Sequence, residues 1–147
     1  NYSNSIPNTN TIKSFSVANM SYTSVIETAK LSLNSTITNG KVVLTGTLTK
    51  EGLAGLQVIM QYDNTKLTFD NIAFDAGASV TNFTTNVDGR LTFGSMDQTK
   101  TSRIKTGTPY KLTFTPKETI TNTAGLFYTV LADAVDGAGN KINLIVE

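Results

Sequence analysis

From about residue 29 to the end of the chain, apolar and polar residues alternate, and turn-forming residues recur at short intervals. The segment 41–48 shows this clearly, because Val42, Leu44 and Leu48 fall on one side of an extended chain while threonines fall on the other. A period of two residues is typical of β-strands, since successive side chains point to opposite faces. The pattern predicts an all-β domain of about nine strands, without a helix.

Residues suited to tight turns separate these segments. Asn39-Gly40 and Asp88-Gly89 predict two-residue hairpin turns, because the central residues of such turns need positive φ angles. Residues 124–132 predict a long strand, and the glycine-rich residues 136–140 predict the turn into the last strand. Short strands with alternating faces and frequent turns favour a two-sheet antiparallel β-sandwich.

The N-terminal segment differs from the rest, because it is rich in Ser, Asn and Thr and contains no glycine. We divide the chain into an N-terminal arm, residues 1–28, and a folded domain, residues 29–147. One interpretation makes the arm a linker or a frayed end. The other makes it an extended arm that docks on a neighbour through Phe15, Val17 and Tyr22, since a solvated linker does not need these apolar side chains.

The composition excludes several kinds of chemistry. The sequence has no cysteine and no histidine, which rules out thiolate nucleophiles, disulfides, imidazole metal ligands and Ser-His-Asp catalysis. The net charge of +1 provides no long-range attraction to nucleic acid or anionic lipid. No apolar run approaches the ~20 residues that a membrane-spanning helix needs. We therefore expect neither a nucleic-acid partner nor membrane insertion.

Two features bear on where the protein acts. The sequence begins at Asn1 rather than at a methionine, which indicates a processed form or an excised fragment. Charged residues are sparse, tryptophan is absent, and Thr, Asn and Ser are abundant. We interpret this composition as that of an extracellular protein or of a protein on a virion surface.

The remaining acid–base groups are carboxylates, lysines and tyrosines, and most aspartates lie near predicted turns. Turn aspartates usually accept backbone hydrogen bonds, so we predict a protein that is not an enzyme and that needs no cofactor. One Ca²⁺ candidate consists of Asp133, Asp136 and Asn140, whose oxygen ligands lie beside flexible glycines. This segment lacks the spacing and the closing glutamate of an EF-hand, and the alternative is a glycine-rich hairpin turn.

Sugar binding is another alternative, because exposed aromatic rings can stack on the apolar face of a sugar. Most aromatic residues fall at alternating positions that predict burial: Phe69, Phe93, Phe114 and Tyr128. Tyr22 and Phe83 remain as candidates for an exposed platform. The absence of tryptophan makes such a platform less favourable than a protein-binding surface.

Several segments between residues 55 and 142 form an ordered set of motifs. Residues 55–63 read Gly-Leu-Gln-Val-Ile-Met-Gln-Tyr-Asp and lead through a turn to Leu-Thr-Phe at 67–69, which resembles the third strand of a cohesin and the turn after it. The segments 86–95, 107–114 and 132–142 are similar to the family's hairpin, its Leu-x-Phe strand and its closing Asp-x-x-Gly-Asn turn. The resemblance covers about residues 29–147.

The resemblance implies a flattened, nine-stranded jelly roll that is related to some carbohydrate-binding modules and has no catalytic activity. The best-known cohesins bind dockerin modules through one sheet face, and they often carry Asn-x-Asp just before the apolar part of this strand. Those positions read Gly55 and Gln57 here, so the chain departs from the dockerin-binding pattern.

On this strand we single out Gln57, Ile59 and Gln61, because Ile59 interrupts an otherwise polar side. Either both faces of the strand are covered, or Ile59 is an apolar anchor among amides on a protein-binding face. We hypothesise a non-enzymatic structural or attachment module on a cell surface or virion, which binds a protein partner or self-associates through its N-terminal arm. The alternatives are a scaffold receptor for a dockerin-like partner and a carbohydrate-binding module.

Overall fold

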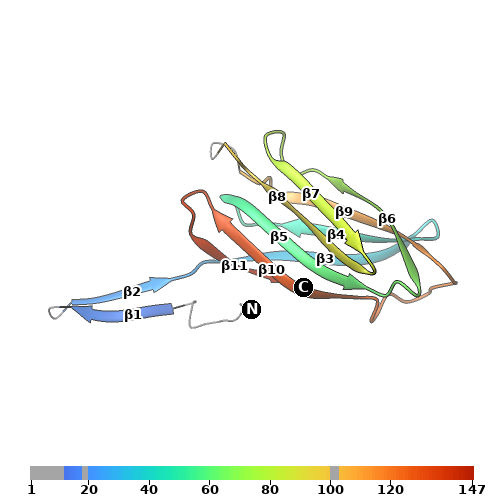
Figure 1. Cartoon of the computed structure of the whole chain (residues 1–147), viewed down its shortest axis with the longest axis horizontal. Coiled ribbons are helices and arrows are strands. Elements are labelled where there is room, and N and C mark those ends of the chain that lie inside the picture. Colours follow the sequence, from blue (N-terminus) through green and yellow to red (C-terminus); the bar gives the residue numbers. More distant parts are fainter. Residues whose placement is uncertain (1–11, 18–19, 100–102) are drawn as a thin grey trace.

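The computed structural model describes residues 12–17, 20–99 and 103–147, with side chains from Ile26 onward. The strands are β1 (Ile12–Val17), β2 (Met20–Val25), β3 (Thr28–Thr38), β4 (Lys41–Leu48), β5 (Leu53–Tyr62), β6 (Leu67–Phe74), β7 (Thr81–Val87), β8 (Arg90–Met96), β9 (Gly107–Pro116), β10 (Phe127–Asp136) and β11 (Lys141–Val146). The prediction of an all-β domain is confirmed (Figure 1). In these ranges no helix is long and apolar enough to cross a membrane.

Nine strands form one nearly closed sheet that folds into two layers (Figure 1). Their order is β6-β9-β4-β3-β11-β10-β5-β8-β7. One layer contains β6, β9, β4, β3 and most of β11, and the other contains β10, β5, β8 and β7. This arrangement confirms the expected sandwich of the jelly-roll type.

The last strand, β11, joins the two layers. Ile142 pairs antiparallel with Ala134 of β10, and residues 143–146 then pair parallel with β3. The other pairings of the nine-stranded sheet are antiparallel, as predicted, and the pairing of β11 with β3 is the parallel exception. Parallel neighbours need a long connection, and here the chain between β3 and β11 provides it.

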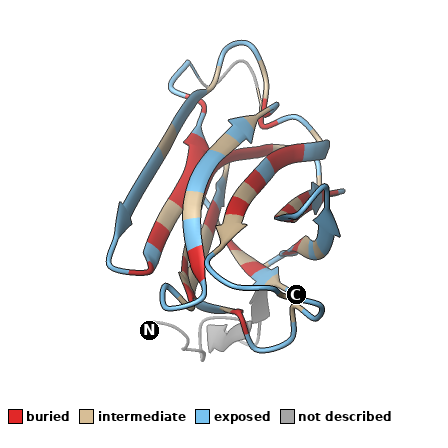
Figure 2. Ribbon diagram, turned by 90° about the vertical axis from the view of Figure 1, so that its right-hand side faces the viewer, coloured by how far each residue is buried: buried red, intermediate tan, exposed pale blue. Residues whose placement is uncertain are grey.

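The core lies between the layers, where the inward side of each strand is apolar. Along β5 the buried residues Leu56, Val58 and Met60 alternate with half-buried outward residues, and Figure 2 shows similar bands on other strands. Phe114 of β9 is fully buried, and its ring centroid lies 5.1 Å from those of Tyr62 and Phe127. Each large apolar side chain buried in this way contributes about 1.5–3 kcal/mol to folding.

Both predicted hairpin turns are present. Asn39 and Gly40 have φ angles of 52° and 75°, and Asp88 and Gly89 have φ angles of 51° and 85°. Two successive residues with positive φ define the turn that matches the twist of paired strands. The local sequence therefore fixes the registers of β3 with β4 and of β7 with β8.

β10 begins and ends later than predicted, at residues 127–136 instead of 124–132. Ala124 belongs to a turn, in which its backbone N–H donates a 2.8 Å hydrogen bond to Asn122 Oδ1. Asp133 indicated a loop in the sequence, but it lies on the outward side of the sheet, where polar side chains remain hydrated. The predicted burial of Tyr128 is also wrong, because this residue faces outward and is 60% exposed.

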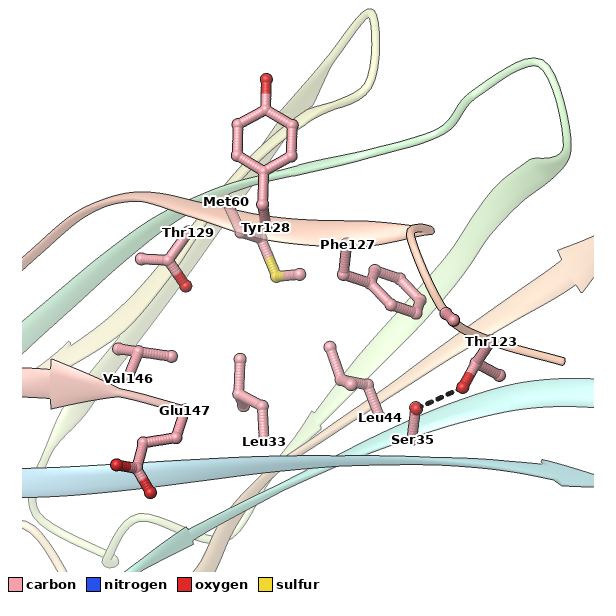
Figure 3. A pocket seen from close by; sticks show the side chains of 11 residues that line it. Leu33, Ser35, Leu44, Met60, Thr123, Phe127, Tyr128, Thr129, Val146 and Glu147 are labelled. Carbon is pink, nitrogen blue, oxygen red and sulfur yellow. Dashed lines mark hydrogen bonds between the residues drawn. The ribbon is translucent and has the colours of Figure 1, made fainter.

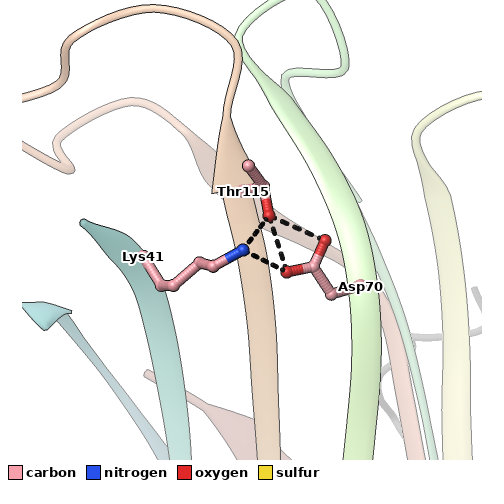
Figure 4. Close-up of polar contacts among 3 residues, drawn as sticks. All are labelled: Lys41, Asp70 and Thr115. Atoms are coloured by element: carbon pink, nitrogen blue, oxygen red, sulfur yellow. Dashed lines mark hydrogen bonds and ion pairs between the residues drawn. The ribbon is translucent and has the colours of Figure 1, made fainter. Parts of the chain in front are cut away.

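A polar network connects three strands of the layer that contains β4 (Figure 4). Lys41 Nζ lies 3.3 Å from Asp70 Oδ2 and 2.6 Å from Thr115 Oγ1, and the Thr115 hydroxyl donates to Asp70 at 2.7 Å. Asp70 lies at a bulge, where the register of β6 against β9 shifts between Phe69 and Asn71. The sequence predicted a break after Phe69, and the structure shows a bulge in a continuous strand.

β1 and β2 form a two-stranded sheet of their own, in which Phe15 lies opposite Tyr22. The described parts of β1 and β2 make no strand pairing with the nine-stranded sheet. Residues 1–11 and 18–19 of the predicted arm lie outside the described residues, and so do the side chains of Phe15, Val17 and Tyr22. The arm's role as a partner contact therefore stays a prediction.

Candidate partner-binding face

The strands β10, β5, β8 and β7 present a mixed apolar and polar surface, which we call the β5 face. Gln57, Ile59 and Gln61 all belong to it, because they alternate with the buried residues of β5. All three are half-buried, and Ile59 is flanked by Leu131 of β10 and Thr92 of β8. The structure brings together the three residues that the sequence singled out, and their role in binding stays a prediction.

The end of the β5 face near the β7–β8 turn combines an aromatic ring with polar groups. Gln61 lies between Tyr128 of β10 and Arg90 of β8, and the Tyr128 hydroxyl donates a 2.8 Å hydrogen bond to Gln61 Oε1. Val87 of β7 lies opposite Arg90 and is 65% exposed. Two large apolar side chains are thus left in contact with water at this end.

The other end of the β5 face contains a shallow apolar groove of about 150 Å³. Gly55 forms part of its floor, since this residue lies between Val135 of β10 and Met96 of β8. Met96 is 50% exposed and Val135 is 40% exposed. The missing side chain at Gly55 therefore leaves a depression between two apolar walls.

Phe83 of β7 completes this groove by lying across Gly94 of β8. A Cβ atom on Gly94 would come within 2.6 Å of the Phe83 ring and 2.1 Å of the Leu56 carbonyl oxygen. Only glycine permits this close approach of the ring to the sheet. Sequence reasoning did not single out Gly94, although a glycine inside a strand is a signal of such close contact.

Two opposite charges lie on the β5 face. Asp133 lies beside Gln57 at the groove, and Arg90 lies beside Gln61 at the other end. Such a pair can fix the orientation of a partner, because charged groups at the rim of an interface contribute more to specificity than to affinity.

A partly buried ion pair lies in the loop after β8, next to Met96 of the groove. The side chain of Asp97 is fully buried, and its Oδ2 lies 3.0 Å from Nη1 of Arg103. The Arg103 guanidinium packs against Gly137, where a Cβ atom would come within 2.1 Å of Nη2. This contact connects the loop that follows Met96 to the turn that follows β10.

The Ca²⁺ candidate divides between two places in the structure. The Asp136 carboxylate accepts hydrogen bonds from the backbone N–H groups of Ala138 and Asn140, at 3.0 and 2.8 Å. These bonds, that from Asn140 above all, lower the pKa of Asp136. Asp133 lies instead on the β5 face. The described part of the chain contains no group of three acidic side chains placed to hold a metal, and Ca²⁺ binding stays a prediction.

The opposite surface of the sandwich, the outward side of β6, β9, β4 and β3, has a different character, and we call it the β4 face. Its central positions are Ser32, Asn34, Thr36, Val43, Thr45, Thr47, Lys111 and Thr113. All but Val43 are polar, and the Lys41–Asp70–Thr115 network continues the same surface. The two faces of one sandwich thus differ sharply in apolar content.

Comparisons with known proteins agree with this architecture. The sequence matches no protein-family model and no curated protein. The sixth cohesin of scaffoldin B from Acetivibrio cellulolyticus, solved in complex with a Cel5 dockerin, superposes with a TM-score of 0.66 at 20% identity over 82% of this chain and 94% of that chain. The type II cohesin A11 from Bacteroides cellulosolvens gives 0.64 at 18% identity over 80% and 95%.

A non-cellulosomal cohesin from the archaeon Archaeoglobus fulgidus gives a TM-score of 0.63 at 12% identity, over 81% of this chain and 86% of that chain. The similarity therefore extends over most of both chains while few residues are shared. The chain folds as a cohesin-like domain.

Proposed function

We propose that this protein is a non-catalytic attachment module that holds a protein partner on its β5 face. The observation that carries the proposal is the contrast between the two outward surfaces of the sandwich. The β5 face exposes Met96, Val135, Tyr128 and Val87, whereas the β4 face is lined by threonines and other polar residues. Exposed apolar clusters that are rimmed by polar groups are typical of protein-binding surfaces.

The geometry of the β5 face favours a partner with a particular chemistry. The groove at Gly55 has the size for one aliphatic side chain, and Asp133 at its edge favours a basic group next to that side chain. Ile59 and Leu131 form an apolar centre between the groove and the Tyr128–Gln61 pair. An anchor residue surrounded by hydrogen-bonding groups is the usual organisation of an interface hot spot.

A scaffold receptor for a dockerin-like partner is the alternative within the same class. It is supported by the similar cohesin of Acetivibrio cellulolyticus, which was solved with a dockerin bound. Gly55 and Gln57 depart from the dockerin-binding pattern that the resemblance implies. A binding assay of this protein against a panel of dockerin modules separates the alternatives. Binding of one dockerin at micromolar affinity favours the scaffold receptor, and binding of none favours a different protein partner.

The role of the β5 face is tested by a matched pair of substitutions. Ile59→Asp places a charge at the centre of the face, and Thr47→Asp places the same charge on the β4 face. We expect Ile59→Asp to weaken the retention of a partner about 100-fold, as loss of a hot spot does, and Thr47→Asp to change it less than about threefold. Circular dichroism and melting temperature check that both variants fold. Equal retention by both variants would contradict the proposal.

We further propose that the module works outside the cell or on a virion and that its N-terminal arm reaches to a neighbouring subunit. The Ser/Asn/Thr-rich composition and the apolar residues of the arm support this role. Deletion of residues 1–24 should abolish assembly in sedimentation velocity experiments and leave the melting temperature of the sandwich unchanged. Assembly that persists after the deletion would exclude the arm.

A further inference from the structure

The wall of the sandwich is incomplete where β11 ends. β11 lies between β10 and β3, but it pairs with β10 only at Ala134 and Val135. Its residues 143–146 then pair with residues 28–31 of β3, and β11 ends there while β3 continues to Thr38. The inward side of β3 becomes progressively exposed beyond this point: Leu31 is fully buried, Leu33 is half-buried and Ile37 is 41% exposed. One strand position is therefore open, in line with β11, and we call it the β3–β10 gap.

A pocket of about 540 Å³ occupies this gap (Figure 3). Its apolar lining comes from Leu33, Leu44, Met60, Phe127 and Val146, and the Thr129 side chain also points into it. Figure 3 shows Val146 and Glu147 at one end, and at the other end the 2.7 Å hydrogen bond between the hydroxyls of Ser35 and Thr123. The pocket thus has the character of a sandwich core that lacks one strand.

The backbone at this pocket is prepared for a further strand. The last rung between β3 and β11 is the 2.6 Å hydrogen bond that the Leu33 N–H donates to the Glu147 carbonyl. Backbone groups alternate in direction along a strand, so the Leu33 carbonyl and the Ser35 N–H point into the β3–β10 gap. No described strand pairs with β3 on this side beyond Leu33. The same holds for β10 at residues 127–133, on the side away from β5.

We propose that the β3–β10 gap accepts residues 13–17 of a second copy of this chain as an inserted strand, parallel to β3 and antiparallel to β10. This inference rests on the assembly role proposed for the arm and is independent of the β5 face. Inserted strands of this kind bind through backbone hydrogen bonds and gain specificity from alternate side chains. The occupant continues the line of β11.

The sequence of the arm matches this site. Phe15 and Val17 alternate with Ser14 and Ser16, so two apolar side chains enter the pocket while two hydroxyls face water. Lys13 shares the inward side with Phe15 and Val17. It enters at the end of the pocket where Glu147 lies, and this carboxylate, which Lys30 also approaches at 3.4 Å, offers an opposite charge. The five residues span about 16 Å in extended form, which is the length of β3 from Leu33 to Ile37.

β1 is available for such an exchange. Among the described residues it pairs only with β2, and an isolated two-stranded hairpin is marginally stable in water. Moving β1 to the gap replaces its backbone hydrogen bonds to β2 by backbone hydrogen bonds to β3 and β10. The move also covers the apolar side chains of the pocket. The balance therefore favours insertion when a second copy is present.

A proline substitution tests the backbone contact. Ser35→Pro removes the N–H that points into the gap, whereas Ser35→Ala removes only the hydroxyl that contacts Thr123. The backbone hydrogen bonds between β3 and β4 are retained in both variants, because the neighbouring residues Asn34 and Thr36 make them. We expect Ser35→Pro to raise the dissociation constant of the dimer about tenfold relative to Ser35→Ala, as loss of one backbone hydrogen bond does. Equal constants for the two variants would overturn the inference.

Engineered cysteines give a second test, since the natural chain has none. Phe15→Cys and Leu33→Cys, each in a separate chain, should form a mixed disulfide after mixing and mild oxidation. Phe15→Cys mixed with Thr47→Cys, on the β4 face, is the matched control and should cross-link at least tenfold more slowly.

The outcomes separate the inference from the proposal on which it rests. Assembly that survives deletion of residues 1–24 removes the role of the arm altogether. Assembly that needs the arm, but shows no preference for Leu33→Cys over Thr47→Cys, excludes only the gap. A monomeric disulfide in the Phe15→Cys/Leu33→Cys double variant would show insertion within one chain and contradict the second copy as its source.

Discussion

At the scale of single residues, two glycines of the β5 face have opposite tolerance for a side chain. A Cβ atom at Gly94 would meet the Leu56 carbonyl oxygen at 2.1 Å, and that atom belongs to the backbone of the neighbouring strand. At Gly55 the tightest contact would be 3.3 Å to a methyl carbon of Val135, a side chain that is 40% exposed, and the Ser95 carbonyl oxygen would lie at an ordinary contact distance of 3.8 Å.

We therefore expect Gly94→Ala to lower the free energy of unfolding by about 2–4 kcal/mol and Gly55→Ala to change it by less than about 1 kcal/mol. Urea denaturation measures both values. Gly55→Ala fills the groove and should still weaken the binding of a partner that inserts a side chain there. A Gly94→Ala protein as stable as the natural one would contradict the contact between Phe83 and the sheet.

Tyr110 gives the second prediction at this scale, because burial raises its pKa to about 12. Its hydroxyl donates a 2.8 Å hydrogen bond to Ser95 Oγ, and the Ser95 hydroxyl donates to Asn82 Oδ1 at 2.7 Å. In the unfolded chain the phenol ionises near pH 10, so the unfolded state loses its proton first as the pH rises. The contribution of Tyr110 to stability is full below pH 10 and is lost as the pH rises towards 12.

Urea unfolding at pH 9 and at pH 11.5 should show this loss, which amounts to about 2 kcal/mol from Tyr110. Tyr110→Phe is the control, since it cannot ionise, and the difference between the two proteins isolates the one phenol from the lysines that titrate in the same range. The same pH slope in both proteins would contradict the burial of the Tyr110 hydroxyl.

At the scale of elements, β11 connects the two layers, and its residues alternate between core and solvent. Leu144 is 6% exposed and its neighbour Ile145 is 40% exposed. Leu144→Ala should lower the free energy of unfolding by about 2–4 kcal/mol, and Ile145→Ala by less than about 1 kcal/mol. Chemical denaturation of the two variants compares them directly. Similar losses for both would mean that β11 does not have the orientation described.

The elements also show what the sequence can predict and what it cannot. Period-two alternation and the Asn39-Gly40 and Asp88-Gly89 turns are local signals, so the strands and hairpins followed from them. The parallel pairing of β11 with β3 depends on residues more than a hundred positions apart, and no local pattern encodes it. The end of β10 was missed because Asp133 is polar on an outward face that the sequence did not define.

At the scale of the whole molecule, the candidate site was predictable only in part. Alternation along β5 placed Gln57, Ile59 and Gln61 together on one side. The sequence could not show that Met96, Val135 and Tyr128 join them, because these residues come from other strands and meet only through the sheet order. The fold thus turns scattered apolar residues into one surface, and it leaves the β4 face polar.

The central claim is that the β5 face is the surface by which this module attaches to a protein partner. Hydrogen–deuterium exchange of the complex with a retained partner tests it most directly, because slowed exchange maps the covered strands. We predict slower exchange in β5, β8 and the adjoining part of β10, with no change in β4 and β9. Protection of β4 and β9, with β5 and β8 exchanging as in the free protein, would contradict the account.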